Sequence, residues 1–284
     1  MAAEDTSESE SSSAEETSEG DSTATDETTE DSSTSISPRL KAARFIAGLF
    51  WASPKGLQRR CAATIITGNT LVTSAVCAKS DYLASKYGQG GWKIITDSVE
   101  RYSQEPPKSV TTYTVKDIKI DECANFAIIS IDGNISFGGD LLPLFISSHE
   151  IKQEATMYTY KTSDPTGYSF MSLTQGTADT CDQFLPGYAD AKFLCTQPVN
   201  GQSVTTDYLG GDPIIGFSTQ PDGPLAVLVG VTGLYYSTLE KAQTASVNDP
   251  TAFRFNAMAA AQVNNIASVA GVEAKSLVSG GELG

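Results

Sequence analysis

Five cysteines are the residues whose type and spacing point most directly to chemistry. Two pairs each enclose a short segment, Cys61 with Cys77 and Cys181 with Cys195, and Cys123 is left over. Since four cysteines can be joined in three ways, local pairing is only a hypothesis at this point. If both pairs are bridged, the protein folded in an oxidising compartment, which favours secretion.

The other reactive side chains form no recognisable set. His149 is the one histidine of the chain and lies in the polar stretch Ser-Ser-His-Glu, where it is interpreted as an exposed loop residue or as a relocated general base. No Cys-x-x-Cys or His-x-x-x-His spacing predicts a zinc site, and no glycine-rich phosphate loop precedes a helix, so neither a metal nor a cofactor is expected. Asn134 begins an Asn-Ile-Ser triplet, which can accept an N-glycan.

Short strands must position these residues. The candidate strands are rich in β-branched and aromatic residues and are separated by turn signals such as Lys55-Gly56 and Gly68-Asn69. They cover residues 45–51, 61–66, 71–74, 92–95, 110–120, 126–131, 155–161, 225–231 and 253–255. Only residues 256–267, rich in Ala, Met and Gln, predict a helix. This pattern predicts an all-β barrel or sandwich with one closing helix.

Charge is concentrated in the N-terminal segment. Residues 1–34 hold twelve Asp or Glu and no Lys or Arg, so they account for most of the net charge of −15 and leave the remainder near −3. Such a segment has too little apolar surface to offset the entropy of ordering it. We therefore expect a disordered acidic tail over residues 1–37, a folded domain over 38–270 and a flexible C-terminal tail over 271–284.

Two classes of partner are excluded by this composition. A nucleic-acid-binding protein needs clustered basic residues, and the only local cluster, Lys55 with Arg59 and Arg60, is interpreted as a solvated hairpin loop. No apolar run approaches the length of a membrane helix. The N-terminus also lacks the apolar core of a signal peptide, which leaves open a start codon added to a processed chain or an intracellular protein.

Residues 61–77, Cys-Ala-Ala-Thr-Ile-Ile-Thr-Gly-Asn-Thr-Leu-Val-Thr-Ser-Ala-Val-Cys, closely resemble a signature of the trypsin-like serine protease family. The family pattern is C-G-G-S-L-I-x-x-x-x-V-V-T-A-A-H-C, in which the two cysteines are bridged and the histidine is the general base. The cysteine spacing matches, but Val76 stands where the histidine belongs.

Further landmarks follow in the family's order. Residues 125–131, Asn-Phe-Ala-Ile-Ile-Ser-Ile, look like the strand D-I-A-L-L-x-L, with Asn125 in place of the aspartate. Cys181 and Cys195 have the spacing of a second family disulfide. Residues 210–216, Gly-Gly-Asp-Pro-Ile-Ile-Gly, take the place of the nucleophile motif G-D-S-G-G-P, with Pro213 at the serine. Residues 227–233 and 250–266 are similar to the next strand and to the last strand with its closing helix.

The resemblance covers residues 40–267 and implies two six-stranded antiparallel β-barrels with a C-terminal helix, bridged at Cys61–Cys77 and Cys181–Cys195. The family's N-terminal I-V-G-G, a third disulfide and a tryptophan in the strand over 227–233 are missing. The resemblance also implies that the catalytic residues are replaced, because valine, asparagine and proline cannot supply base, orienter and nucleophile. Pro213 in addition lacks the backbone N–H of an oxyanion hole.

Three other positions complete the expected site. The residue that matches Asp212 in active relatives receives the new N-terminal ammonium, so Asp212 needs another partner here or the loop relaxes. Asp207 falls near the base of the specificity pocket and is interpreted as a retained site for a basic side chain or as a solvated loop residue. Cys123 is expected to be a buried free thiol, with an intermolecular bridge as the alternative.

The sequence therefore predicts a secreted, catalytically inactive serine protease homologue that binds a protein partner, with no metal and no catalytic residue. It is similar in kind to the glucanase inhibitor proteins of oomycetes, which implies a secreted hydrolase of a host or competitor as the partner. Two alternatives stay open: a serine-type endopeptidase with non-standard residues, and a structural surface glycoprotein with the acidic segment as a stalk.

Overall fold

The computed structural model describes residues 45–96, 111–138, 141–148, 151–152, 155–160, 170–184, 193–199, 210–220, 224–235, 254–279 and 283. All of them belong to the compact unit Ser37–Gly284. The acidic tail expected over residues 1–37 lies outside the described residues.

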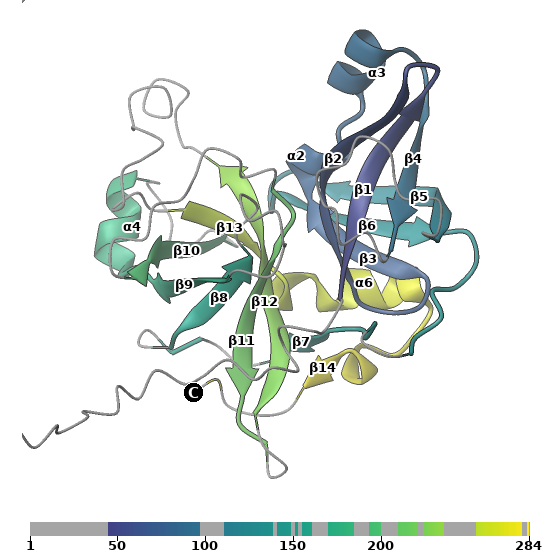
Figure 1. The fold of residues 1–284 in the computed structure, drawn as a ribbon. Coiled ribbons are helices and arrows are strands. Elements are labelled where there is room, and N and C mark those ends of the chain that lie inside the picture. Colours follow the sequence, from purple (N-terminus) through teal and green to yellow (C-terminus); the bar gives the residue numbers. More distant parts are fainter. Residues whose placement is uncertain are drawn as a thin grey trace, which may run out of the picture. The chain divides into compact units, whose positions relative to one another are not determined.

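Six strands near the N-terminal side close into a first barrel (Figure 1). They pair in the order β1-β2-β3-β6-β5-β4, and every pair is antiparallel. Their bounds are β1 (Ile46–Ser53), β2 (Gly56–Ile65), β3 (Thr70–Ser74), β4 (Gly91–Ile95), β5 (Thr112–Asp121) and β6 (Phe126–Ile131). Fully buried aliphatic side chains such as Leu49, Ile65, Leu71, Ile94 and Ile129 fill the interior.

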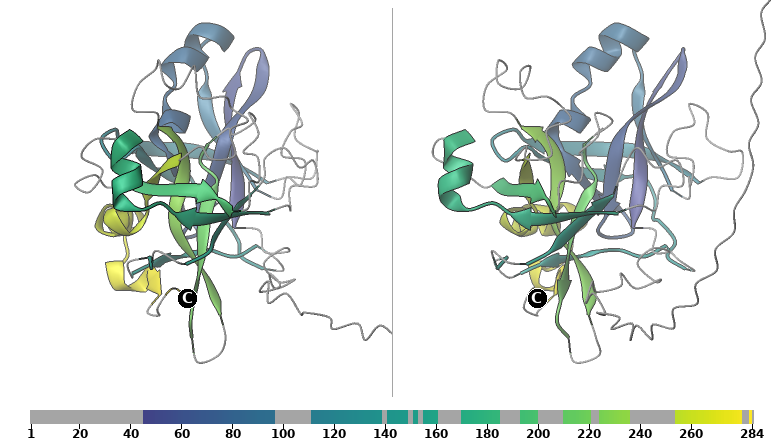
Figure 2. Two further views of the ribbon diagram at one scale, coloured as in Figure 1. Left: turned by 90° about the vertical axis from the view of Figure 1, so that its left-hand side faces the viewer. Right: turned by 60° about the vertical axis from the view of Figure 1, so that its left-hand side comes forward.

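The β1–β2 hairpin extends beyond the rest of this barrel and is accompanied by helix α3 (Asp81–Tyr87), as Figure 2 shows. Gly56 begins β2 at a φ of 102°, a conformation that glycine adopts without strain. The Trp51 indole donates to the Gly88 carbonyl at 3.3 Å and its ring meets that of Trp92 edge to face. These contacts hold the helix against the hairpin.

A second ring of six strands forms the other barrel. Its strands follow the order β11-β8-β9-β10-β13-β12, and pairing of β11 with β12 closes the ring. Their bounds are β8 (Met157–Tyr160), β9 (Phe170–Gln175), β10 (Phe193–Pro198), β11 (Pro213–Ser218), β12 (Leu225–Tyr235) and β13 (Arg254–Met258). Two short strands, β7 (Phe145–Ser147) and β14 (Val278–Ser279), extend the sheet by parallel pairing beyond β12.

The fold class expected from the sequence is confirmed: two six-stranded antiparallel barrels followed by a C-terminal helix. Strands β7, β9, β10, β11 and β14 are not among the expected strands. Proline at the start of β11 and at the end of β10 lowers the local strand signal, and long-range pairing forms these strands nonetheless.

The expectation of a single helix is wrong. Besides α3, the described chain contains α2 (Ala75–Ala78) and α4 (Ala178–Phe184). Both are shorter than two turns, too short for a helical periodicity in the sequence, and each carries a cysteine of a disulfide. Tertiary contacts and not helix propensity account for them.

The expected helix over residues 256–267 begins too early. Asn256 and Ala257 continue β13 because they pair with Leu194 and Phe193 of β10, and this pairing overrides the helix propensity of Ala and Met. A 3₁₀ turn, η3 (Ala260–Gln262), follows, and helix α6 runs over Val263–Ala270. It ends at Gly271, whose φ of 71° is the left-handed conformation typical of a helix C-terminus.

The segment 271–284 was expected to be a flexible tail, but its described residues include a strand and a core residue of the second barrel. After the short turn η4 (Ala274–Ser276), strand β14 pairs with β7, and Leu283 forms a bridge with Ser218. Leu283 is 2% exposed and belongs to the core of the barrel. Apolar burial near the chain end, which charge and composition do not reveal, explains the difference.

Candidate functional site

Val76 is the second residue of helix α2, and this helix begins directly after the last residue of β3. The Cys61–Cys77 disulfide ties this helix to β2, with 5.8 Å between the two Cα atoms. The Val76 side chain is half-buried, and its carbonyl accepts a hydrogen bond from Arg60 Nη2 at 3.3 Å. Val76, which the sequence resemblance aligns with the general base, is therefore an apolar side chain on a short helix held by a disulfide.

Asn125 contacts α2 from the turn between β5 and β6. It ends the turn after β5, is 2% exposed, and has a φ of 48°, which asparagine tolerates better than most residues. Its carbonyl accepts the Ala75 N–H at 3.1 Å, and its Oδ1 accepts the Val76 N–H in a long bond of 3.4 Å. Asn125 thus satisfies two of the N–H groups that a helix N-terminus leaves without partners.

The second barrel covers the other side of Asn125. Gly233 of β12 lies so close that a Cβ added there would collide with Asn125 Nδ2. This nitrogen is buried and has no hydrogen-bond partner among the described residues. Val76 and Asn125 therefore meet at a point where both barrels contribute residues.

The loop that precedes Pro213 packs on the first barrel. Gly210 and Gly211 have φ values of 80° and 78°, and the Gly210 carbonyl accepts the Ala62 N–H at 3.3 Å. A Cβ on Gly210 would lie 3.3 Å from the Cys77 sulfur, and one on Gly211 would collide with Thr73 Oγ1 and the Ala62 carbonyl. Only glycine fits this approach, which brings the loop beside the disulfide next to Val76.

The N–H groups of this loop are directed into the protein. Gly211 donates to the Thr232 carbonyl at 2.7 Å, and Asp212 donates to Thr232 Oγ1 at 3.0 Å. Thr232 in turn donates its N–H to the Asp212 carbonyl at 2.8 Å. Because Pro213 has no N–H, residues 211–213 offer no free donor to an oxyanion.

Pro213 itself is a buried strand residue. It begins β11 opposite Val231, and its carbonyl accepts the Thr159 hydroxyl at 2.9 Å. Asp212 is fully buried beside it, and its backbone is bonded to Thr232. Asp207, the other residue expected here, and His149 both lie outside the described residues.

Both expected disulfides are present, and Cys123 is free but not buried. Cys181 and Cys195 are bridged and join α4 to β10. Cys123 is exposed, which corrects the expectation of a buried thiol. It occupies the turn after β5, where Ala124 and Asn125 take the inward positions, and its neighbour Glu122 pairs with Lys79 at 3.2 Å.

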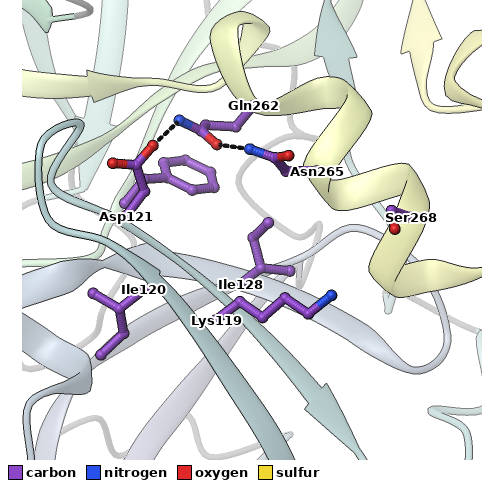
Figure 3. Close-up of a pocket in the computed structure, with 8 residues that line it drawn as sticks. Lys119, Ile120, Asp121, Ile128, Gln262, Asn265 and Ser268 are labelled. Carbon is purple, nitrogen blue, oxygen red and sulfur yellow. Dashed lines mark hydrogen bonds between the residues drawn. The ribbon is translucent and has the colours of Figure 1, made fainter.

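A pocket of about 240 Å³ opens between β5, β6 and helix α6 (Figure 3). Phe126 and Ile128 contribute apolar lining, and a chain of hydrogen bonds runs along one side. Asn265 Nδ2 donates to Gln262 Oε1 at 2.7 Å, and Gln262 Nε2 donates to the Asp121 carboxylate at 2.9 Å. The pocket has the groups to hold a small, partly polar moiety. The sequence did not predict it because its walls are some 140 residues apart.

Neither a metal centre nor a membrane span is found in the described part of the chain. No group of three or more His, Cys, Asp or Glu side chains there could hold a metal ion. None of the described helices has the length and apolar character needed to cross a bilayer.

Comparisons with known proteins bear on the fold. No family model matches the sequence, and no curated protein matches it. Among solved structures, kallikrein-related peptidase 10 has a TM-score of 0.55 to this chain, with 13% sequence identity over 81% of this chain and 97% of that one. At this identity the likeness concerns the fold alone. The two barrels and this match together identify the architecture: the chain has the trypsin-like serine protease fold.

Proposed function

We propose that this protein is a catalytically inactive relative of the trypsin-like peptidases and acts by binding another protein. The observation that carries the proposal is the hydrogen bonding of residues 211–213, whose N–H groups are engaged by Thr232 or missing. An oxyanion hole needs free, preorganised donors, and loss of one donor costs about 10²–10³-fold in rate.

The replaced side chains add to this loss. Val76 neither accepts nor donates a proton, and Asn125 uses its carbonyl groups to hold the N-terminus of α2. In a related constellation, removal of the nucleophile or the base costs about 10⁶-fold in kcat. No mechanism remains for these positions to catalyse hydrolysis, whereas the barrels and the disulfides form a rigid support for surface loops.

The finer proposal is a secreted inhibitor. Two disulfides are compatible with folding in an oxidising compartment. The resemblance in kind to oomycete glucanase inhibitor proteins makes a secreted hydrolase of a host or competitor the candidate partner.

A covalent probe tests the absence of catalysis. We expect the full chain to show no labelling by a fluorophosphonate and no turnover of casein or of fluorogenic Arg and Lys peptides, with trypsin as the positive control. Labelling of one hydroxyl, localised by peptide mass spectrometry, or turnover that copurifies with the chain through several columns would establish the alternative of an endopeptidase with non-standard residues.

Restoring the three family residues tests the role of the loop. In a Val76→His, Asn125→Asp, Pro213→Ser variant we still expect no labelling, because Gly211 and Asp212 keep their N–H groups on Thr232 and position 213 is buried. The circular dichroism and unfolding midpoint of the variant verify that it folds. Stoichiometric labelling would show that the loop N–H groups are available after all, and would remove the main support for the proposal.

Capture of a protein partner from the secretions of a host or competitor tests the binding function. The immobilised full chain is compared with the same chain after reduction and alkylation of its disulfides. A hydrolase retained only by the native chain, whose activity falls on titration with the free protein, is the expected outcome. If no protein is retained specifically by the native chain, the binding function is contradicted.

A further inference from the structure

The Asn-Ile-Ser triplet at residues 134–136 is the only Asn-x-Ser/Thr triplet in the chain, with x any residue except proline. It follows β6 directly, after a turn at Gly133 with a φ of 86°. The site described above makes no use of it. Because the triplet is unique, any N-linked modification of this protein can be assigned to a single side chain.

The structure separates the three residues of the triplet by their surroundings. Ile135 is 3% exposed, belongs to the core of the first barrel, and donates its N–H to the Gly68 carbonyl at 2.6 Å. Asn134 and Ser136, on either side, are both exposed. The buried isoleucine thus anchors the segment, while both polar side chains that a glycosyltransferase reads stay accessible to solvent.

The neighbouring turn leaves room beside the asparagine. A Cβ placed on Gly68 would lie 3.4 Å from Asn134 Oδ1 and 3.6 Å from Asn134 Cβ. These are ordinary contact distances, so Gly68 lies beside the asparagine and the Asn134 side chain stays exposed. An exposed amide just beyond the end of a strand suits the attachment of a large polar group.

We propose that Asn134 carries an N-linked oligosaccharide. In the transfer step a bond forms between Asn134 Nδ2 and the anomeric carbon of an oligosaccharide carried on a lipid pyrophosphate. The bond from that carbon to the pyrophosphate oxygen breaks, the lipid pyrophosphate leaves with the electron pair, and the amide loses one proton. No oxidant or reductant is involved.

The register of the first barrel defines where the glycan lies. Strand β6 pairs with β3 so that Phe126 faces Ser74 and Ser130 faces Thr70. Asn125 and α2 therefore lie at one end of β6 and Asn134 beyond the other end. Six strand residues correspond to about 20 Å at roughly 3.3 Å per residue. The glycan leaves the region around Val76 uncovered.

The test uses the full chain, expressed behind a cleavable secretory leader in a eukaryotic host. We expect one N-glycan, seen as a mobility shift that a peptide N-glycosidase removes with conversion of Asn134 to aspartate. Asn134→Gln and Ser136→Ala abolish the shift, whereas Ser136→Thr keeps it. Asn264→Gln, at an exposed asparagine of α6 outside any such triplet, is the matched control and keeps it as well.

The mobility shift is measured both for protein held in the intracellular membrane compartments and for secreted protein. A variant that is not secreted can then still be scored for the glycan. An unmodified Asn134 in the wild-type chain, in a host that glycosylates a reporter protein, overturns the proposal. A glycan that persists in Asn134→Gln overturns it too. Neither result affects the outcome of the fluorophosphonate test, so the proposal of a glycan and the proposal of lost catalysis are tested independently.

The position of the glycan is tested through Cys123, which is exposed in the turn that ends at Asn125. We expect a polyethylene-glycol maleimide to react with this thiol at the same rate before and after enzymatic removal of the glycan. A rate that rises several-fold on removal would place the glycan over that end of the barrel and contradict the register argument.

Discussion

Asn125 holds the N-terminus of helix α2 through two hydrogen bonds. Its backbone carbonyl and its Oδ1 bind the first two N–H groups of α2, and its φ of 48° brings both acceptors to the same side. A short helix next to a disulfide needs such partners because its own turns cannot supply them. Asparagine supplies these two acceptors without a charge.

Two substitutions separate the backbone conformation of Asn125 from its hydrogen bonds. We expect Asn125→Ala to lower the free energy of unfolding by about 2–3 kcal/mol, since it loses the side-chain bond and adds left-handed strain of about 1–2 kcal/mol. Asn125→Gly loses the bond without the strain and is expected to cost about 1 kcal/mol less. Urea unfolding measures both. Equal losses would mean that the strain contributes nothing.

Cys123 provides a second prediction at this scale. Because the thiol is exposed and both other pairs are bridged, one equivalent of thiol per native chain is expected to react with a chromogenic disulfide reagent. A Cys123→Ser variant should show none under native conditions. Two or more equivalents from the wild-type chain would mean that one of the two disulfides is open.

The elements of the second barrel depend on the chain end. Leu283 enters the core formed by Met157, Ile214, Val229 and their neighbours, and it lies against Gly216 of β11. A Cβ on Gly216 would lie 2.9 Å from Leu283 Cδ2 and 3.0 Å from Val229 Cγ2. The glycine and the leucine are therefore complementary in volume.

A double-mutant cycle tests this complementarity. Leu283→Ala removes a buried side chain and is expected to cost about 2–4 kcal/mol, and Gly216→Ala overpacks the same place at about 1–3 kcal/mol. In the double variant the new methyl group enters the space that the leucine leaves, so the combined loss should be smaller than the two single losses together. Additive losses, measured by urea unfolding, would show that the two positions are not in contact.

At the scale of the whole molecule, charge and fold are separate properties. The twelve acidic residues of the first 34 account for most of the net charge, while the compact unit begins at Ser37. The barrels hold the buried apolar side chains that stabilise the protein. An overall pI near 4.4 consequently says little about the surface of the folded unit.

Deletion of residues 1–36 tests this separation. The shortened chain is expected to unfold with the same midpoint and the same denaturant dependence, within about 0.5 kcal/mol, because both described hydrophobic cores are built from residues after position 44. It should elute from an anion exchanger at clearly lower salt than the full chain. A lower midpoint or a less cooperative transition would show that the acidic segment stabilises the barrels.

From the sequence, the pattern of short strands and the resemblance to the protease family predicted the fold class, and the resemblance selected the two disulfides among the three possible pairings. The cysteine spacing and the β-rich runs around residues 61–77 and 126–131 that carry this resemblance are local features of the sequence. The failures were also local: residues 256–258 have helix propensity and form a strand, and Val278, Ser279 and Leu283, expected in a flexible tail, add a strand and a core residue to the second barrel.

Only the tertiary structure decided which backbone N–H groups already have a hydrogen-bond acceptor within the protein. The bonds from Gly211 and Asp212 to Thr232, from Ala62 to Gly210 and from α2 to Asn125 join segments 20 to 148 residues apart. A backbone N–H has no letter in the sequence, and its partner is selected by the tertiary structure: Gly211 and Asp212 donate to Thr232 of β12 within the second barrel, and Ala62 donates to Gly210 between the two barrels. These bonds from Gly211 and Asp212, together with the missing N–H of Pro213, leave residues 211–213 without a donor for an oxyanion.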